Sequence, residues 1–316
     1  MKNQALTLAA TLLALLLGEA VVRIAVVTLH RPPLVVSDPD AGWAARPNLR
    51  NLDVAASGGH FAASTDSVGR RLVVATSVTK PRSTGNAVLL VGDSFVYGLS
   101  VSDSETLGNQ LALTAGDRAI INLGVPGYGT DQELVSVEKY FSASRTPTVG
   151  DIVIVVFEND FRDVQRHLDP WLGYTKPVYA APAGVLERPA FHRAAWELLM
   201  DHSRLVWLVA TKFTNARDHE VLVSDAGEGV VVACVTAMRK LSEARGAHVH
   251  VVAHRRLGQA STVSEAVWRD FLQRTAATDI TDSIHVAGLP SPLSFDGVHW
   301  SAEGNRRVAE LIHHML

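Results

Sequence analysis

Residues 87–98 read AVLLVGDSFVYG, a continuous apolar run followed at once by glycine, aspartate and Ser94. Such a run is typical of a parallel strand that is buried on both faces of its sheet. Serine and aspartate beside glycine are common turn residues, so the segment alone favours a turn in which Ser94 caps the next helix. Ser94 is a nucleophile only if the rest of the chain supplies a base, an orienting acid and oxyanion donors.

Strand-like runs alternate with helical patterns along the rest of the chain. The predicted strands after the first are AIINLG (119–124), DIVIVVF (151–157), HVHVVAH (248–254) and the weaker SIHVAG (283–288). Helices are predicted near Leu107 and Leu111, over residues 131–141, 231–244 and 263–276, and at the C-terminus. This alternation predicts an α/β fold with a parallel sheet covered on both faces.

The first thirty residues form an apolar segment with two interpretations. Residues 5–18 (ALTLAATLLALLLG) have the length of a signal-peptide core, and small residues follow it. Continued to residue 29, the segment spans a bilayer, with Glu19 and Arg23 one helical turn apart and able to pair. A buried core helix is disfavoured because the segment is apolar all round. We predict an N-terminal transmembrane helix, with a cleaved signal and secretion as the alternative, and either places the rest outside the cytoplasm.

Composition excludes some classes of function and divides the chain into regions. The formal net charge of −3 gives no electrostatic reason to expect nucleic acid, and the single cysteine, Cys234, excludes an intramolecular disulfide. We predict an anchor or signal over 1–30, a linker with a small hairpin over 31–86, and the main α/β domain over 87–316. Within that domain, the aromatic and proline-rich residues 161–200 interrupt the alternation and are predicted to form a lid or substrate-recognition insert.

Polar residues follow the predicted strands at the edge where parallel sheets bind ligands. Asp296 and His299 lie three apart, so in a tight loop the carboxylate can reach one imidazole nitrogen and leave the other free for Ser94. Gly127 lies in a glycine-rich segment where a backbone N–H can approach a substrate, and Asn159 offers a side-chain amide. Each residue has an ordinary structural interpretation, but together and in this order they indicate acyl transfer by a serine nucleophile.

These residues resemble the four blocks of the SGNH (GDSL) hydrolase superfamily: GDS at 92–94, Gly127, Asn159 and DGVH at 296–299. The resemblance implies a three-layer α/β/α sandwich with a central parallel, flavodoxin-like sheet over 87–316. It implies Ser94 as nucleophile, His299 as base and then acid, and Asp296 as its orienting partner. The oxyanion hole would comprise the N–H groups of Ser94 and Gly127 and the Asn159 side chain. The chain departs from the family in having Phe157 and Glu158 before Asn159, where the family usually has Gly-x.

No cofactor or metal site is predicted. The G-x-S-x-G elbow of α/β-hydrolases and the glycine-rich phosphate-binding motifs are absent. The histidines at 248, 250 and 254 would face the same side of a strand, but no carboxylate lies near them in the sequence at a spacing that would complete a metal site.

We therefore predict a membrane-anchored serine esterase that removes acetyl or acyl groups from a small-molecule or glycan ester. Acyl transfer to a cell-surface glycan would use the same residues and is the first alternative. A non-catalytic glycan-binding or assembly protein of the same fold is the second. Oligomeric state is left open.

Overall fold

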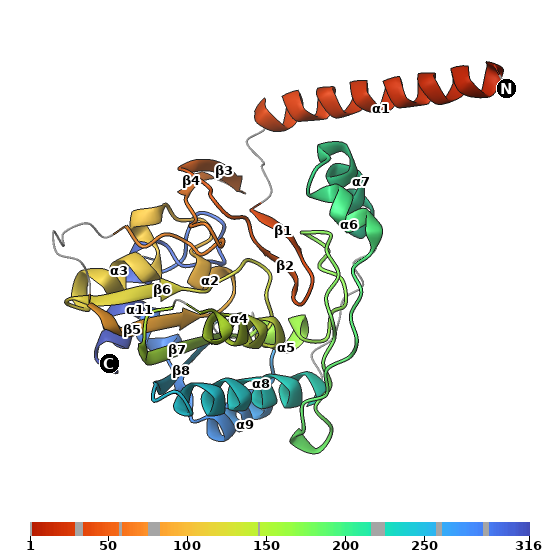
Figure 1. The fold of residues 1–316 in the computed structure, drawn as a ribbon. Helices are drawn as coiled ribbons and strands as arrows, with labels where there is room; N and C mark the ends of the chain where they lie inside the picture. The colour runs from red at the N-terminus through yellow and green to blue at the C-terminus, as the bar shows by residue number, and fades with distance from the viewer. Residues whose placement is uncertain are drawn as a thin grey trace.

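The computed structural model describes residues 2–28, 34–56, 59–74, 83–144, 146–215, 225–256, 261–286 and 291–316 (Figure 1). At its centre lies a five-stranded parallel sheet in the order β6-β5-β7-β8-β9. The strands are β5 (Ser83–Val91), β6 (Arg118–Asn122), β7 (Val149–Phe157), β8 (His248–His254) and β9 (Thr278–Asp279). The apolar runs predicted as the first four strands all lie in this sheet.

Helices cover both faces of the sheet and make three layers (Figure 1). Alternate strand residues point to opposite faces, so Leu89 and Ile152 pack in one core cluster and Val88 and Val153 in another. The first cluster joins the sheet to α4 (Thr130–Ser142), α8 (Asp225–Glu243) and α9 (Glu265–Thr275). The second joins it to α3 (Leu107–Thr114) and α11 (Ala302–His313). The predicted α/β/α sandwich is confirmed.

The fifth strand was predicted in the wrong place. Ser283 and Ile284 belong to the short helix α10 (Thr281–Ile284), residues 287–288 lie outside the described residues, and β9 precedes the predicted strand. Ile280 and Ile284 are both buried, and their spacing of four residues suits a helical turn rather than a strand. The Asp279 carboxylate also accepts the Thr281 N–H at 2.9 Å, which favours a turn at this point.

Two hairpins precede the sandwich. The predicted one pairs β3 (Leu52–Ala56) with β4 (Gly59–Ala63), while its turn at 57–58 lies outside the described residues. The second pairs β1 (Val35–Asp38) with β2 (Gly42–Ala45) in a stretch predicted as linker. It is folded onto the domain because Trp43 is buried and donates its indole N–H to the Pro126 carbonyl at 3.0 Å.

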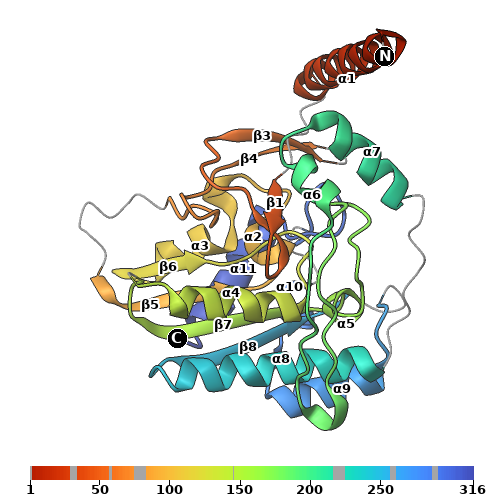
Figure 2. The ribbon, with the colours of Figure 1, turned by 45° about the vertical axis from the view of Figure 1, so that its right-hand side comes forward.

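The segment after β7 crosses the carboxyl end of the sheet and then reaches the N-terminal helix (Figure 2). It contains α5 (Asp160–Asp163), the 3-10 turn η2 (Pro182–Gly184), α6 (Ala195–Met200) and α7 (Arg204–Asn215). A fully buried ion pair between Lys176 and Asp131 of α4 fastens it to the sandwich. It therefore packs as part of the domain, close to the edge where the polar strand ends lie.

Helix α1 (Lys2–Thr28) carries the 22-residue apolar stretch Asn3–Ile24, whose most apolar 18 residues have a mean hydropathy of 2.2. Its length and composition are those of a membrane span, and none of the stretch is buried inside the structure.

Candidate active site

Ser94 is the first residue of the four-residue helix α2 (Ser94–Tyr97), directly after β5. The cap of this helix is Asp93, whose carboxylate accepts the Phe95 N–H at 2.9 Å. The Ser94 hydroxyl is therefore not used as the cap that its turn-like sequence suggests.

Ser94, His299 and Asp296 form a continuous hydrogen-bonded row. His299 Nε2 lies 2.9 Å from Ser94 Oγ, and His299 Nδ1 lies 2.7 Å from Asp296 Oδ2. The other Asp296 oxygen accepts the backbone N–H groups of Val298 at 2.9 Å and His299 at 3.0 Å. These two bonds close the D-x-x-H loop tightly, so a spacing of three residues brings carboxylate and imidazole together.

Ser100 is a further member of the row that the sequence did not reveal. Its hydroxyl donates to Asp296 Oδ2, the oxygen that also faces His299. Burial raises the pKa of Asp296, but hydrogen bonds from His299, Ser100 and the Val298 N–H outweigh it and hold that pKa well below its usual range. Ser100 is 4% exposed and has a φ of +71°, a conformation uncommon for residues other than glycine. No sequence motif marks such a residue.

Gly127 lies in the loop after β6, which is joined to the Ser94 turn by the bond from the Val125 N–H to the Gly92 carbonyl at 3.3 Å. The insert covers this glycine closely. A Cβ at Gly127 would lie 2.9 Å from a methyl carbon of Leu172 and 3.0 Å from an oxygen of Asp169, and its φ of +78° also favours glycine. Asp169 and Leu172 are therefore neighbours of the site that lie outside the four sequence motifs.

Asn159 is linked to the turn of Ser94 by a hydrogen bond to Asp93, the residue before the serine. Its amide nitrogen donates to Asp93 Oδ2 at 3.2 Å and to Asp163 Oδ2 at 2.8 Å. Both amide protons are therefore directed at carboxylates, so an oxyanion would have to compete with one of them for the amide.

Glu158 and Phe157, which stand where the family usually has Gly-x, are held by contacts with residues other than Ser94. Glu158 is fully buried, and its carboxylate accepts from Ser261 Oγ at 2.6 Å and pairs with Arg256 at 3.2 Å. Phe157 stacks on His254, with ring centroids 4.5 Å apart. Burial lowers the pKa of His254 well below its usual value, which makes it a neutral aromatic neighbour of the site.

Buried carboxyl groups lie behind Ser94. Burial raises the pKa of Asp93 to about 6, and it raises those of Glu133 and Asp160 well above their usual values. Neither oxygen of Glu133 has a hydrogen-bond partner among the described residues. Burial therefore favours the neutral form of Glu133 and Asp160 in the folded protein, and it shifts Asp93 in the same direction.

The Glu133 carboxyl is expected to make the protein less stable as pH rises. The folded state retains a proton that the unfolded chain releases near pH 4.5, so stability falls as pH rises from there through the raised pKa. Glu133→Gln keeps the shape of the neutral acid but cannot ionise, so it removes this pH-dependent loss of stability. Thermal unfolding at pH 5 and pH 8 should show a smaller fall in Tm for Glu133→Gln than for the wild type, about 2–4 °C for each kcal/mol removed.

Glu138→Gln is the control because Glu138 lies on the same helix but is partly exposed and paired with Arg188. If Tm falls equally between pH 5 and pH 8 in the wild type and in Glu133→Gln, Glu133 ionises in the folded protein without loss of stability.

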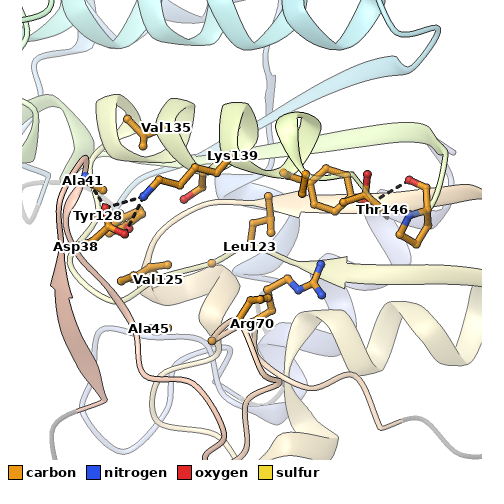
Figure 3. Close-up of a pocket in the computed structure, with 18 of the residues that line it drawn as sticks. Asp38, Ala41, Ala45, Arg70, Leu123, Val125, Tyr128, Val135, Lys139 and Thr146 are labelled. Carbon is orange, nitrogen blue, oxygen red and sulfur yellow. Dashed lines mark hydrogen bonds and ion pairs between the residues drawn. The ribbon is translucent and has the colours of Figure 1, made fainter.

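A separate cavity of about 500 Å³ lies between α4, β2 and the loop after β6. Leu123, Val125 and Tyr128 line it, and Figure 3 shows Lys139 reaching across one end toward Asp38. Ser94, Asp296 and His299 are not among the residues that line it, so it is distinct from the row described above.

No protein-family profile and no curated protein sequence matches the chain. Similar solved structures include a lipase from a goat rumen metagenome (11% identity, TM-score 0.43, 72% of this chain and 96% of that one). A GDSL-like lipase from Bacteroides thetaiotaomicron has 12% identity and a TM-score of 0.38, covering 75% of this chain and 89% of its own. AlinE4, an SGNH-hydrolase family esterase, has 15% identity and a TM-score of 0.35, covering 73% and 93%.

The architecture and the contacts at the strand ends agree with the sequence resemblance. Ser94, Gly127 and Asn159 lie after β5, β6 and β7, respectively. The DGVH segment at 296–299 is hydrogen-bonded to the first of them through His299 and Ser94. The chain thus has a three-layer α/β/α fold, as the resemblance to SGNH hydrolases implies, and its polar strand-end residues meet at the carboxyl edge of one parallel sheet.

Proposed function

We propose that this protein is a serine ester hydrolase with Ser94 as its nucleophile. The observation that carries the proposal is the unbroken row from Ser94 Oγ through His299 to Asp296, with both links shorter than 3 Å. A histidine held between a hydroxyl and a carboxylate can accept the hydroxyl proton while the carboxylate stabilises the imidazolium.

The reaction would proceed in two steps through an acyl-enzyme. Ser94 Oγ attacks the ester carbonyl carbon as His299 Nε2 takes the hydroxyl proton. The tetrahedral intermediate then collapses, the C–O bond to the alcohol breaks, and His299 returns the proton to the leaving oxygen. Water, deprotonated by His299, attacks the acyl-enzyme, and Ser94 leaves with a proton while the acid is released.

The developing oxyanion requires donors, and three lie on the loops around Ser94. We assign the backbone N–H of Ser94 at the start of α2, the backbone N–H of Gly127 and the amide of Asn159 to this role. One such donor is typically worth about 3–4 kcal/mol in the transition state. An oxyanion would take one amide proton of Asn159 from Asp93 or Asp163, whose bonds to it are 3.2 Å and 2.8 Å in this structure.

We also propose that α1 anchors the catalytic domain in a membrane and that the domain, residues 87–316, lies on the extracytoplasmic side. The length and hydropathy of Asn3–Ile24 support the anchor. Small-molecule and glycan esters are both candidate substrates, with residues 161–200 contributing to their selection, because the insert covers Gly127.

The proposal is tested with the full chain in detergent or nanodiscs, using p-nitrophenyl acetate and a fluorophosphonate probe. Turnover and a covalent adduct that peptide mass spectrometry locates on Ser94 are the expected results. A folded protein that neither turns over the ester nor reacts with the probe would refute the proposal and favour a binding protein of the same fold.

Ser100 is expected to position the carboxylate for this reaction. Ser100→Ala removes its hydrogen bond to Asp296 and should lower kcat/KM by about 10-fold, because a bond to a charged group is worth about 1.5–3 kcal/mol. The Asp296 carboxylate would then hold more negative charge toward His299 and favour its protonated form. The acid limb of the kcat/KM profile should therefore move to higher pH.

Ser100→Gly separates this effect from backbone strain, since glycine adopts a φ of +71° at little cost. The glycine variant should show the same displaced acid limb with better thermal stability than the alanine variant. An unchanged pH profile in both variants would leave Ser100 as a structural residue only.

A further inference from the structure

The helices α6 and α7 are joined to the candidate membrane helix by a polar contact. The Glu19 carboxylate of α1 accepts from Ser203 Oγ at 2.7 Å and from the N–H groups of Arg204 at 2.9 Å and Leu205 at 3.0 Å. Arg23, one turn further along α1, pairs with Glu19 and donates to the His202 carbonyl at 2.7 Å. Glu19 thus satisfies N–H groups at the start of α7, and α7 is held at one level along α1.

This level lies inside the apolar stretch of α1. Glu19 precedes Ile24, the end of the stretch, by five residues, which is about 7.5 Å along a helix axis. If Asn3–Ile24 crosses the roughly 30 Å hydrocarbon layer, the start of α7 lies at the edge of that layer rather than in bulk water. Glu19 is acceptable at this depth because Arg23 and the α7 N–H groups pair with it.

The side chains that α6 and α7 present to solvent suit this position. Leu198, Leu199, Val209 and Phe213 are 45%, 56%, 46% and 64% exposed. Among the described residues outside α1, eleven large apolar side chains are exposed, and six of them lie between residues 171 and 213. A cavity of about 560 Å³, lined by α7, Leu15 of α1 and Leu168, opens in the same region. Such a concentration marks a contact surface, and here it continues the surface of α1.

The same surface adjoins the candidate active site. The turn that the Leu168–Thr175 bridge closes carries Trp171, which is 72% exposed, and beside it Leu172, which faces Gly127. In both views the insert runs from α5, at the carboxyl end of the sheet, to α6 and α7 beneath α1 (Figures 1 and 2). Tryptophan is characteristic of membrane–water interfaces.

We propose that α6 and α7, through Leu198, Leu199, Val209 and Phe213, lie in the interface of the bilayer that α1 spans. The occupant of this apolar face is phospholipid. This inference rests on the proposed membrane anchoring by α1, and it adds that the catalytic domain is seated on the membrane, with Trp171 and the insert next to the lipid surface.

The test uses the full chain in nanodiscs of phosphatidylcholine and phosphatidylglycerol, with an environment-sensitive fluorophore attached to an introduced cysteine. The native Cys234 is fully buried, and unsubstituted protein measures any label it takes. The positions are Leu199→Cys and Phe213→Cys on the proposed surface and Leu15→Cys on α1. Leu113→Cys on α3 is the matched control, since Leu113 is apolar and 58% exposed, and helix α3 lies away from α1 and α7 in Figure 1.

Lipids brominated in their acyl chains should quench most of the fluorescence at 15, 199 and 213 and leave 113 unchanged. Aqueous iodide should quench 113 and spare the other three. If lipid quenches the label at residue 15 but not those at residues 199 and 213, the proposed contact of α6 and α7 with the bilayer is wrong and the anchor stands. This holds whether water or another protein covers that face of α6 and α7. Absence of lipid quenching at 15 would overturn the anchor and the surface together, whereas the esterase assay tests Ser94 separately.

Discussion

Ser94→Ala is expected to lower kcat for ester hydrolysis by about 10⁴–10⁶-fold, because removal of the nucleophile leaves only binding and oxyanion stabilisation. The substitution removes the hydroxyl that His299 Nε2 contacts at 2.9 Å. No other hydroxyl among the described residues is hydrogen-bonded to His299 Nε2, so no neighbouring group is placed to replace Ser94. Initial rates with p-nitrophenyl acetate, corrected for spontaneous hydrolysis, measure the effect.

The structure predicts that this variant stays folded. Helix α2 is capped by Asp93, not by Ser94, and alanine is a better helix former than serine. Thermal unfolding should therefore be close to that of the wild type, and Ser142→Ala, at an exposed serine near the end of α4, controls for loss of a hydroxyl in general. Retention of a tenth of the wild-type rate by folded Ser94→Ala would place the nucleophile elsewhere.

The parts of the fold and site that were predictable depend on short-range patterns. A strand buried on both faces must be a continuous apolar run, so the runs 87–91 of β5 and 152–157 of β7 are visible in the sequence. Parallel strands bring their carboxyl ends to one edge, which is why Ser94 and Asn159 can be associated across 65 residues. The Asp296–His299 contact needs only a tight loop.

The parts that were missed depend on contacts between distant segments. The hairpin of β1 and β2 has strands of four residues, too short to show alternation, and it is held by Trp43 against the loop of Pro126. Ser100 meets Asp296 across 196 residues. The Asn159 amide meets the Asp93 carboxylate across 66 residues, at 3.2 Å.

Asp296→Asn is expected to lower kcat by about 10⁴-fold at neutral pH through the tautomer of His299. Oδ1 of Asp296 accepts two backbone N–H groups, from Val298 and His299, so an asparagine would keep its carbonyl oxygen at that position. Its NH₂ group would then face His299 Nδ1, which must become an acceptor. The imidazole proton would move to Nε2, where it points at Ser94 and prevents removal of the serine proton.

Asp296→Ala removes the same charge as Asp296→Asn but leaves no group that imposes the wrong tautomer on His299. Asp296→Ala leaves Nδ1 without a fixed partner and allows either tautomer, so it should retain more activity than Asp296→Asn although it removes more of the side chain. Asp53→Asn is the matched control, because Asp53 also lies beside a histidine, His60 at 3.3 Å, but at the exposed β3–β4 hairpin. Rates measured from pH 6 to 9 test the order wild type, Asp296→Ala, Asp296→Asn. An alanine variant slower than the asparagine variant at every pH would contradict the tautomer argument, because it would show that an amide at position 296 still orients His299 productively.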